Sequence, residues 1–321
     1  MQIGNKGIEE NMWTEILLLI AGLVLIVGGA EALVDGASAI ARKLRISEFV
    51  IGITIVGFGT SCPELVVSLT GAIEGNADIS LGNVIGSNLF NVLMILGLTA
   101  LISPISVTET NRKRDMPLML LVTFLLLFCG MAGNSVSRAE GIVFLVLFAF
   151  YMYICFKYDK GSNEANGEQT ERNLFIAVLL VAGGLAGLVF GGRLFVDNAV
   201  NLAHRLGVSD KVIAITLLAG GTSLPELATC VVAAAKHKDQ LALGNIIGSN
   251  IFNILLILGI SATVTPLSFA SISITDSVAF AASAALLWLC TYTGHKDRID
   301  RWEGFIMLAF FAAYYVILFR N

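Results

Sequence analysis

Charged residues are scarce in this chain: Asp, Glu, Lys and Arg make up 14% of its 321 residues, whereas hydrophobic residues make up 56%. The mean hydropathy of +0.82 excludes an ordinary water-soluble domain of this length. Histidine is also rare, with 3 residues, and no cluster with the 5 cysteines has the spacing of a metal site or a disulfide framework. We therefore expect no cofactor.

Nucleophile and base sets are missing as well. An intramembrane hydrolase needs a nucleophile with its base or a two-metal arrangement, and no such set of histidines or aspartates is present. We therefore expect that the chain is not an enzyme. We also expect a lipid bilayer around it, no nucleic-acid partner and no obligatory protein partner.

Long polar segments are equally few, and apolar stretches fill most of the chain. A helix needs roughly 20 apolar residues to cross a bilayer core about 30 Å thick. Alternation of apolar and polar residues is absent, and lipid requires each backbone group to be paired internally, so helices are expected. The fold class is predicted as an all-α membrane protein with about ten transmembrane helices, near residues 13–33, 49–71, 80–102, 116–132, 139–156, 174–202, 211–235, 241–264, 277–293 and 303–319.

One polar segment divides the chain into two similar halves. We expect an N-terminal tail over 1–12, a first five-helix repeat over 13–157, a cytoplasmic linker over 158–173 and a second five-helix repeat over 174–321. Five spans per half is an odd number, so the second half enters the membrane from the opposite side. The halves are therefore predicted to be inverted-topology repeats.

The basic residues indicate an orientation. With the N-terminus outside, 14 of the 20 Lys and Arg fall in or beside cytoplasmic loops. The positive-inside rule therefore favours both termini outside. The first span has neither the basic start nor the cleavage site of a signal peptide, so we expect it to be retained.

Two polar motifs occur twice within the apolar chain. Residues 59–65 read Gly-Thr-Ser-Cys-Pro-Glu-Leu, and residues 221–227 read Gly-Thr-Ser-Leu-Pro-Glu-Leu. A second block, Gly-Asn-Val-Ile-Gly-Ser-Asn-Leu-Phe-Asn over 82–91, recurs over 244–253 with Ile in place of Val and of Leu. The offset is constant at 162 residues (226 − 64 and 253 − 91). The duplication predicts one ion site built from two halves.

Glu64 and Glu226 are the central candidates. Each is an intramembrane acid, and no Lys or Arg lies in either predicted span to pair with it. A buried, unpaired carboxylate is costly and is functional by default. The alternative, a protonated Glu in a structural hydrogen bond, explains a duplicated pair poorly. Inverted repeats would bring the two acids together near the middle of the membrane.

Small polar residues share a helical face with these acids. Thr60 and Ser61 precede Glu64 by four and three residues, and Ser87 precedes Asn91 by four. Taken singly, such hydroxyls can instead serve helix packing or bond the preceding turn. Asn88 and Asn250 lie off this face, so we leave them outside the site as capping or bridging residues. The second half repeats the set with Thr222, Ser223, Glu226, Ser249 and Asn253.

Proline follows each Thr-Ser pair. Pro63 and Pro225 remove a helical hydrogen bond, which frees carbonyl groups near Thr60 and Thr222 to face an ion. Hard oxygen ligands without sulfur or imidazole suit Ca²⁺. Two Glu would neutralise one Ca²⁺, and hydroxyls, amides and carbonyls can coordinate Na⁺, so the same site could serve both ions in alternation.

The paired motifs resemble the two alpha repeats of the sodium/calcium exchangers, prokaryotic type, in the cation/calcium antiporter superfamily. The resemblance implies a ten-helix antiporter that exchanges Ca²⁺ for Na⁺ by alternating access, with two mobile helices sliding across a fixed core, in the inner membrane. It places the Ca²⁺ carboxylates on Glu64 and Glu226, the carbonyl ligands on Thr60 and Thr222, and the central polar pair on Asn91 and Asn253. It places further Na⁺ ligands on Gly57, Ser61, Ser87, Ala219, Ser223 and Ser249.

The chain departs from part of this family at one position. Some prokaryotic relatives carry Asp where this chain has Asn253, and a neutral Asn removes a titratable group. The number of Na⁺ ions and any coupled proton therefore stay open, although the G-N-x-x-E pattern of the proton-coupled relatives is absent. Potassium-dependent exchange and proton/calcium exchange are the alternatives within the same class. A passive cation channel is a further alternative, which would need a continuous pore or several subunits.

Overall fold

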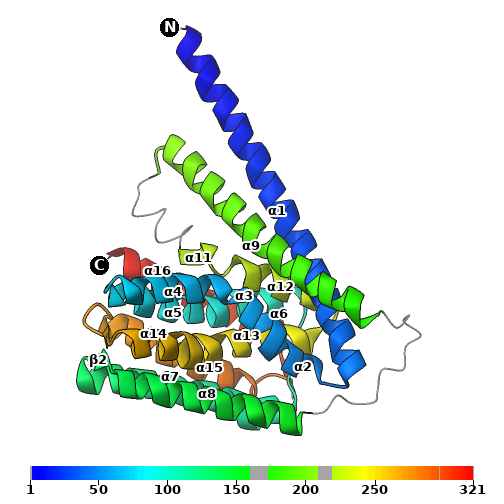
Figure 1. Cartoon of the computed structure of the whole chain (residues 1–321), viewed down its shortest axis with the longest axis vertical. Coiled ribbons are helices and arrows are strands. Elements are labelled where there is room, and N and C mark those ends of the chain that lie inside the picture. Colours follow the sequence, from blue (N-terminus) through cyan, green and yellow to red (C-terminus); the bar gives the residue numbers. More distant parts are fainter. Residues whose placement is uncertain (1, 160–172, 209–218, 296, 321) are drawn as a thin grey trace.

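The computed structural model describes residues 2–159, 173–208, 219–295 and 297–320, and nearly all of its elements are helices (Figure 1). In the first half they are α1 (Gln2–Leu44), α2 (Glu48–Ile51), the π-helix η1 (Gly52–Val56), α3 (Gly57–Thr60), α4 (Cys62–Ile73), α5 (Ala77–Leu89), the π-helix η2 (Phe90–Leu96), α6 (Gly97–Ile102), β1 (Ile105–Ser106), the π-helix η3 (Asn111–Asp115), α7 (Met116–Gly133), β2 (Ser135–Val136) and α8 (Arg138–Tyr158).

The second half repeats much of this order. Its described elements are α9 (Leu174–Arg205), α11 (Ala219–Gly221), α12 (Leu224–Ala235), α13 (Asp239–Ile251), the π-helix η5 (Phe252–Ile257), α14 (Leu258–Val264), β3 (Leu267–Ser268), α15 (Ile274–Cys290), β4 (Arg298–Ile299) and α16 (Arg301–Arg320).

Apolar helices of membrane-spanning length account for most of the predicted segments. Seven described helices are long and apolar enough to cross a bilayer, and an eighth span forms if the bent pair 48–60 and 62–73 is counted as one. The predicted segments 211–235 and 277–293 contain shorter apolar helices, Leu224–Ala235 and Ile274–Cys290. The prediction of an all-α membrane protein is confirmed at this level, and the count of ten stays a prediction.

Two of the predicted segment boundaries, those of the linker and of the N-terminal tail, can be compared with the described helices. Most of the linker at 158–173 lies outside the described residues, between the end of α8 at Tyr158 and the start of α9 at Leu174. Backbone helix starts at Gln2, so the predicted tail at 1–12 is continuous with α1.

The helix that carries Glu64 is broken just before it. The axes of the segments 48–60 and 62–73 differ by 51° at Ser61. Pro63 lies in the first turn of α4, where its missing N–H leaves the Gly59 carbonyl without a helical hydrogen bond from it. The second half has the same local backbone at the matching residue: Ser223, before α12, has φ −89° and ψ 7°, and Ser61 has φ −84° and ψ 8°.

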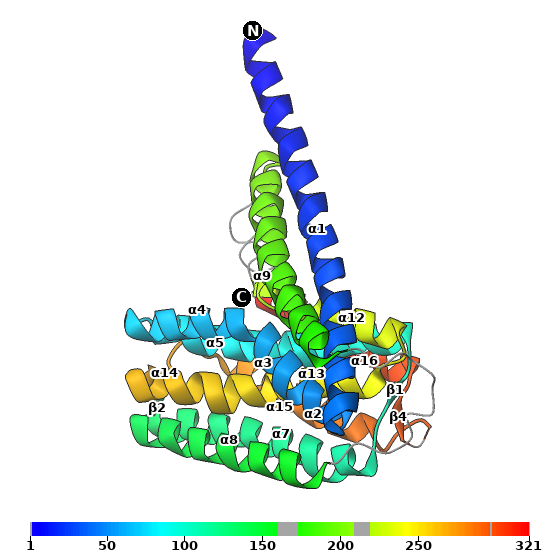
Figure 2. The ribbon, with the colours of Figure 1, turned by 45° about the vertical axis from the view of Figure 1, so that its right-hand side comes forward.

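Helices α1 and α9 form an antiparallel pair that crosses the other helices at a steep angle (Figures 1 and 2). Glycines let their backbones meet. A Cβ added at Gly29 would lie 2.8 Å from the Gly184 carbonyl oxygen, and one at Gly191 would lie 2.8 Å from the Gly22 carbonyl oxygen. The two contacts are equivalent in the two halves, because Gly29 and Gly191 are 162 residues apart and so are Gly22 and Gly184.

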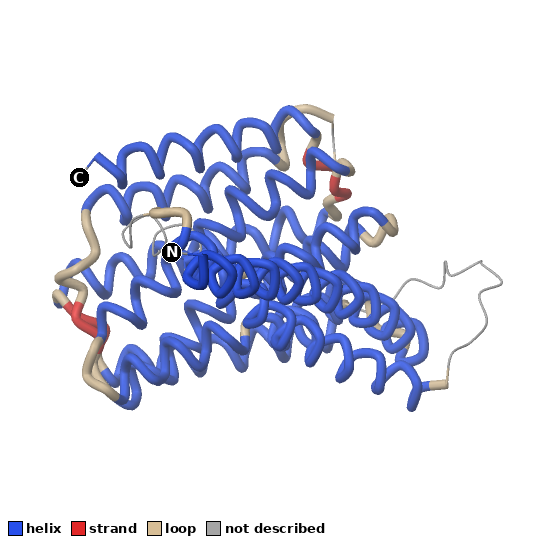
Figure 3. The backbone as a smooth tube through the Cα atoms, turned by 90° about the horizontal axis from the view of Figure 1, so that it is seen from above, coloured by secondary structure: helices blue, strands red, loops and turns tan. Residues whose placement is uncertain are grey.

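Two small antiparallel sheets lie at opposite ends of the helix bundle (Figure 3). In one, β1 pairs with β4 and Ile105 faces Ile299; in the other, β2 pairs with β3 and Val136 faces Leu267. Figure 2 places β2 at one end and both β1 and β4 at the other. Strands β1 and β3, which begin 162 residues apart, therefore lie at opposite ends.

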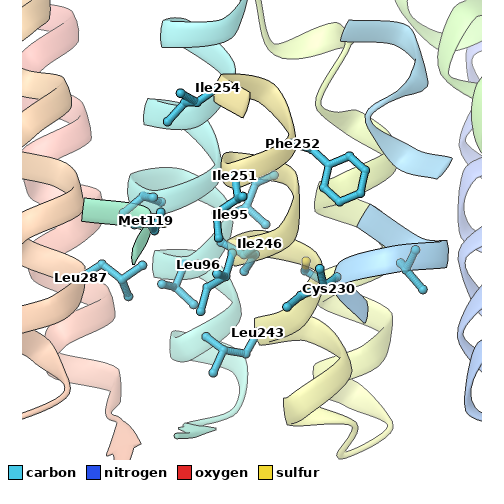
Figure 4. Packing of buried hydrophobic residues seen from close by; sticks show 14 of the residues in the cluster. Ile95, Leu96, Met119, Cys230, Leu243, Ile246, Ile251, Phe252, Ile254 and Leu287 are labelled. Atoms are coloured by element: carbon cyan, nitrogen blue, oxygen red, sulfur yellow. The ribbon is translucent and has the colours of Figure 1, made fainter. Parts of the chain in front are cut away.

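The centre of the molecule is built around α13. Its residues from Leu241 to Ile251 are all buried. Figure 4 shows Ile246 and Ile251 of this helix beside Ile95 and Leu96 of η2, with Met119 further out. The π-helices η2 and η5, most of whose residues are buried, are therefore held by a packed apolar core, which is where irregular backbone is tolerated in a membrane.

Candidate functional site

Glu64 and Glu226 occupy matching places in the first turns of α4 and α12. Both glutamates are buried, with 1% of each residue's surface exposed. The positive end of the helix dipole lies there, which favours an acidic side chain. Helix α4 and helix α12 contain no Lys or Arg to neutralise these acids.

Serine hydroxyls connect the halves across the site. Ser61 Oγ donates to Glu226 Oε1 at 2.9 Å, and Ser223 Oγ donates to Glu64 Oε1 at 3.1 Å. Each glutamate is therefore held by the serine that precedes the other glutamate. Ser87 Oγ of α5 also donates to Glu64 Oε1, at 3.4 Å.

Several buried oxygens of the site have no hydrogen-bond partner among the described residues. The Oε2 atom of each glutamate is one, and Ser249 Oγ and the Oδ1 atoms of Asn91 and Asn253 are others. Native proteins rarely leave such atoms unpaired, and each one calls for an explanation such as a bound ion. These five atoms all belong to residues in the predicted ion site.

The two central asparagines lie on π-helices. Asn91 follows the first residue of η2, and Asn253 follows the first residue of η5. A π-helical turn widens the helix locally and is frequent at functional sites. In the described structure, neither asparagine forms a hydrogen bond with a glutamate.

Thr60 and Gly57 lie beside α13. Thr60 Oγ1 donates to the Gly57 carbonyl oxygen at 3.4 Å and to Asn245 Oδ1 at 3.2 Å. A Cβ added at Gly57 would lie 3.4 Å from the Ser249 backbone nitrogen, so only a small residue fits easily there. Thr222 lies in the turn before α12, and Ala219 begins α11, with its side chain outside the description.

Three asparagines of the second motif that were left outside the predicted site support it through their side chains: Asn83, Asn88 and Asn245. Asn83 Nδ2 donates to the Glu64 carbonyl oxygen at 3.2 Å, and its counterpart Asn245 accepts the hydrogen bond from Thr60. Asn88 Nδ2 donates to the Asn250 carbonyl oxygen at 3.2 Å, so of the two expected roles, capping or bridging, Asn88 has the bridging one. The Asn250 side chain has neither role, because it bonds the Ile246 carbonyl oxygen of its own helix. Their duplication within the second motif is the signal that could have identified them.

The arrangement suits a cation held by oxygen. No group of three or more His, Cys, Asp or Glu side chains gathers anywhere in the described ranges as it would in a typical metal centre. Binding would instead rest on two carboxylates with neutral hydroxyl, amide and carbonyl oxygens, a ligand set suited to Ca²⁺ and other hard cations.

Comparison with known proteins gives a consistent result along the whole chain. The family model described as sodium/calcium exchanger protein matches residues 14–157 and again residues 176–320. The putative antiporter CaxA of Alkalimonas amylolytica is 41% identical over 320 residues, covering 97% of this chain and 100% of that protein. The sodium/calcium exchanger MaX1 of Methanosarcina acetivorans is 37% identical, covering 94% of this chain and 98% of that protein.

Solved structures agree with the fold. The sodium-calcium exchanger NCX_Mj, in crystals soaked with 2.5 mM Na⁺ and 0.1 mM Sr²⁺, superposes with a TM-score of 0.84 at 33% sequence identity. The match covers 95% of this chain and 99% of that one. These relatives are named as exchangers and antiporters, which are transporters rather than enzymes.

Proposed function

Because this chain belongs to the sodium/calcium exchanger protein family, we propose that it is a secondary active antiporter that exchanges Ca²⁺ for Na⁺ by alternating access. The observation that carries the proposal is the reciprocal pair of hydrogen bonds, Ser61 to Glu226 and Ser223 to Glu64. They join two acids from opposite halves in one buried site whose remaining carboxylate oxygens are unpaired.

The proposed ligands are those that the family resemblance places on this chain. Glu64 and Glu226 supply the charge that neutralises Ca²⁺, with carbonyl oxygens near Thr60 and Thr222. Neutral oxygens then serve Na⁺ when it takes the place of Ca²⁺; they come from Gly57, Ser61, Ser87, Asn91, Ala219, Ser223, Ser249 and Asn253. Two carboxylates neutralise one divalent ion or two monovalent ions equally well, which is what makes an exchange of unlike charges possible.

The proposed architecture is ten transmembrane helices in two inverted repeats, over 13–157 and 174–321. It is supported by contacts that exchange on a shift of 162 residues and by the place of β1 and β3 at opposite ends of the bundle (Figure 3). The separate family matches at 14–157 and 176–320 support the same division. We further propose the inner membrane as the location, with both termini outside.

Transport by the purified protein in liposomes tests the proposal. An outward Na⁺ gradient should drive uptake of ⁴⁵Ca²⁺, and collapse of the gradient with a Na⁺ ionophore should abolish it. The Glu64→Gln variant in matched liposomes provides the background. Absence of Na⁺-driven uptake by folded protein would contradict the proposal.

The remaining candidates are separated in the same liposomes. A requirement for K⁺ on the Ca²⁺ side would indicate potassium-dependent exchange, and uptake driven by a pH gradient alone would indicate proton/calcium exchange. Ca²⁺ flux with no opposing ion gradient would indicate a passive channel.

A further inference from the structure

Asn88 and Asn250 are equivalent residues of the duplicated motif, yet they have different partners. Both are buried, on α5 and α13. Asn250 Nδ2 donates to the Ile246 carbonyl oxygen at 2.7 Å, within its own helix. Asn88 Nδ2 instead crosses to the other half and donates to the carbonyl oxygen of Asn250 at 3.2 Å.

The second contact of Asn88 reaches the candidate ion site. Its Oδ1 accepts a hydrogen bond of 2.8 Å from Nδ2 of Asn253. The amide nitrogen of Asn88 is directed at the Asn250 carbonyl, so the amide oxygen is the end that faces Asn253. Asn253 must therefore present its own nitrogen to Asn88, since two amide oxygens have no hydrogen to share.

This contact decides which end of the Asn253 amide is left for a cation. With the nitrogen held by Asn88, the Asn253 oxygen is the end that has no partner among the described residues. In Asn91, the equivalent of Asn253, both the amide nitrogen Nδ2 and the amide oxygen Oδ1 have no hydrogen-bond partner among the described residues. Asn91 and Asn253 are equivalent positions of the duplicated motif, but only the Asn253 amide is held in one orientation by a hydrogen bond.

We propose that Asn88 is a positioning residue that holds Asn253 with its amide oxygen toward the transported cation. A cation is repelled by an amide NH₂ group and attracted by the amide oxygen, so fixing the orientation in advance saves the cost of ordering it on binding. The ligand class is a hard cation bound through neutral oxygen. The inference rests on the proposed function, because it names a support for that same site.

A double-mutant cycle between Asn88 and Asn253 tests this coupling. The variants are Asn88→Ala, Asn253→Ala and the double variant, with Asn250→Ala as the matched control that removes the equivalent amide of the other half. Half-saturating Na⁺ and Ca²⁺ concentrations and maximal rates are measured in liposomes. Ion-dependent shifts of the melting temperature, with Na⁺ or Ca²⁺ as the only added ion, are measured in detergent.

We expect Asn88→Ala to raise the half-saturating concentration of at least one ion about three- to tenfold, the range for one neutral hydrogen bond. Asn253→Ala should raise it as much or more, and the double variant should match Asn253→Ala alone. Asn250→Ala should change it less than about twofold, because that amide bonds only its own helix. The Na⁺ and Ca²⁺ arms show which ion Asn253 contacts.

A purely structural role of Asn88 would lower the melting temperature of the ion-free protein and the maximal rate while leaving half-saturation unchanged. That result would overturn the proposal. Two other results would also overturn it: a double variant whose half-saturating concentration rises by the product of the two single increases, or equal increases from Asn88→Ala and Asn250→Ala. If Asn88→Ala does not fold, Asn88→Ser replaces it in the same cycle. If the wild-type protein shows no Na⁺-driven uptake, the melting-temperature shifts still decide the role of Asn88, so the two failures are distinguishable.

Discussion

At the scale of single residues, Glu64 and Glu226 each supply half of the negative charge of the candidate site. Replacing either by Gln keeps its shape and an oxygen to accept the serine hydrogen bond, but removes one charge. We expect Glu64→Gln and Glu226→Gln each to lower Na⁺-driven ⁴⁵Ca²⁺ uptake to background. The folded protein should be as stable or more stable, because a costly buried charge is gone.

The matched control is Glu74→Gln, which alters an exposed acid at the end of α4. This variant should transport at the wild-type rate. Near-normal uptake by either of the buried variants would show that two carboxylates are not required.

Protons should compete with Ca²⁺ for the same carboxylate oxygens. Acid converts Glu64 and Glu226 to the neutral form, which removes the charge that holds the divalent ion, so uptake should fall as the pH is lowered. Tenfold more Ca²⁺ should move the midpoint of inhibition down by about half to one pH unit, since one Ca²⁺ displaces one or two protons. Initial rates over a grid of pH and Ca²⁺ concentration measure this shift, and a midpoint independent of Ca²⁺ would rule out competition.

At the scale of elements, the contact between α1 and α9 depends on residues without a side chain. Gly29→Val would push a Cβ against the Gly184 carbonyl oxygen and the Leu188 nitrogen, each 2.8 Å away. Overpacking of this kind typically costs about 1–3 kcal/mol. We expect a lower melting temperature and slower exchange from this variant.

The neighbouring position provides the control for Gly29. A Cβ added at Gly28 meets no atom within 4 Å. Gly28→Val therefore makes a similar substitution in the same helix turn and should leave both the melting temperature and the exchange rate nearly unchanged. Equal effects of the two variants would mean that helix propensity, and not the contact with α9, is responsible.

At the scale of the whole molecule, ion pairs join α1 both to its partner α9 and to the rest of the protein. Arg205 of α9 bonds Glu15 of α1 at 2.9 Å, whereas Lys236, which follows α12, bonds Asp35 of α1 at 2.7 Å. Alternating access by movement of the α1 and α9 pair would keep the first contact and break the second. Cysteines at 35 and 236, joined by a short thiol crosslinker in a cysteine-free background, should therefore stop exchange.

A crosslink between cysteines at 15 and 205 provides the comparison, because it joins only the two helices expected to move together. Exchange should continue with that crosslink in place. Cleavage of a reducible crosslinker should restore exchange in the 35–236 variant. Full exchange with the 35–236 crosslink intact would show that this helix pair does not gate the site.

The sequence by itself determined the parts of this protein that depend on composition and on local chemistry. Long apolar stretches specify membrane helices because the bilayer leaves the backbone no other partner. Pro63 and Pro225 each remove a helical hydrogen bond because they lack an N–H, and the structure breaks just before both. The constant offset of 162 residues was equally readable, since a duplicated motif needs no coordinates.

Only the tertiary structure decided which partners these residues have. The sequence around Ser61 and Ser223 does not indicate that each hydroxyl donates a hydrogen bond to the glutamate of the opposite half. Asn88 and Asn250 are the same residue in the same motif, yet only Asn88 spans the two halves. The physical reason is that a hydrogen bond forms only over about 3 Å, a distance set by how the helices pack and not by the order of residues along the chain.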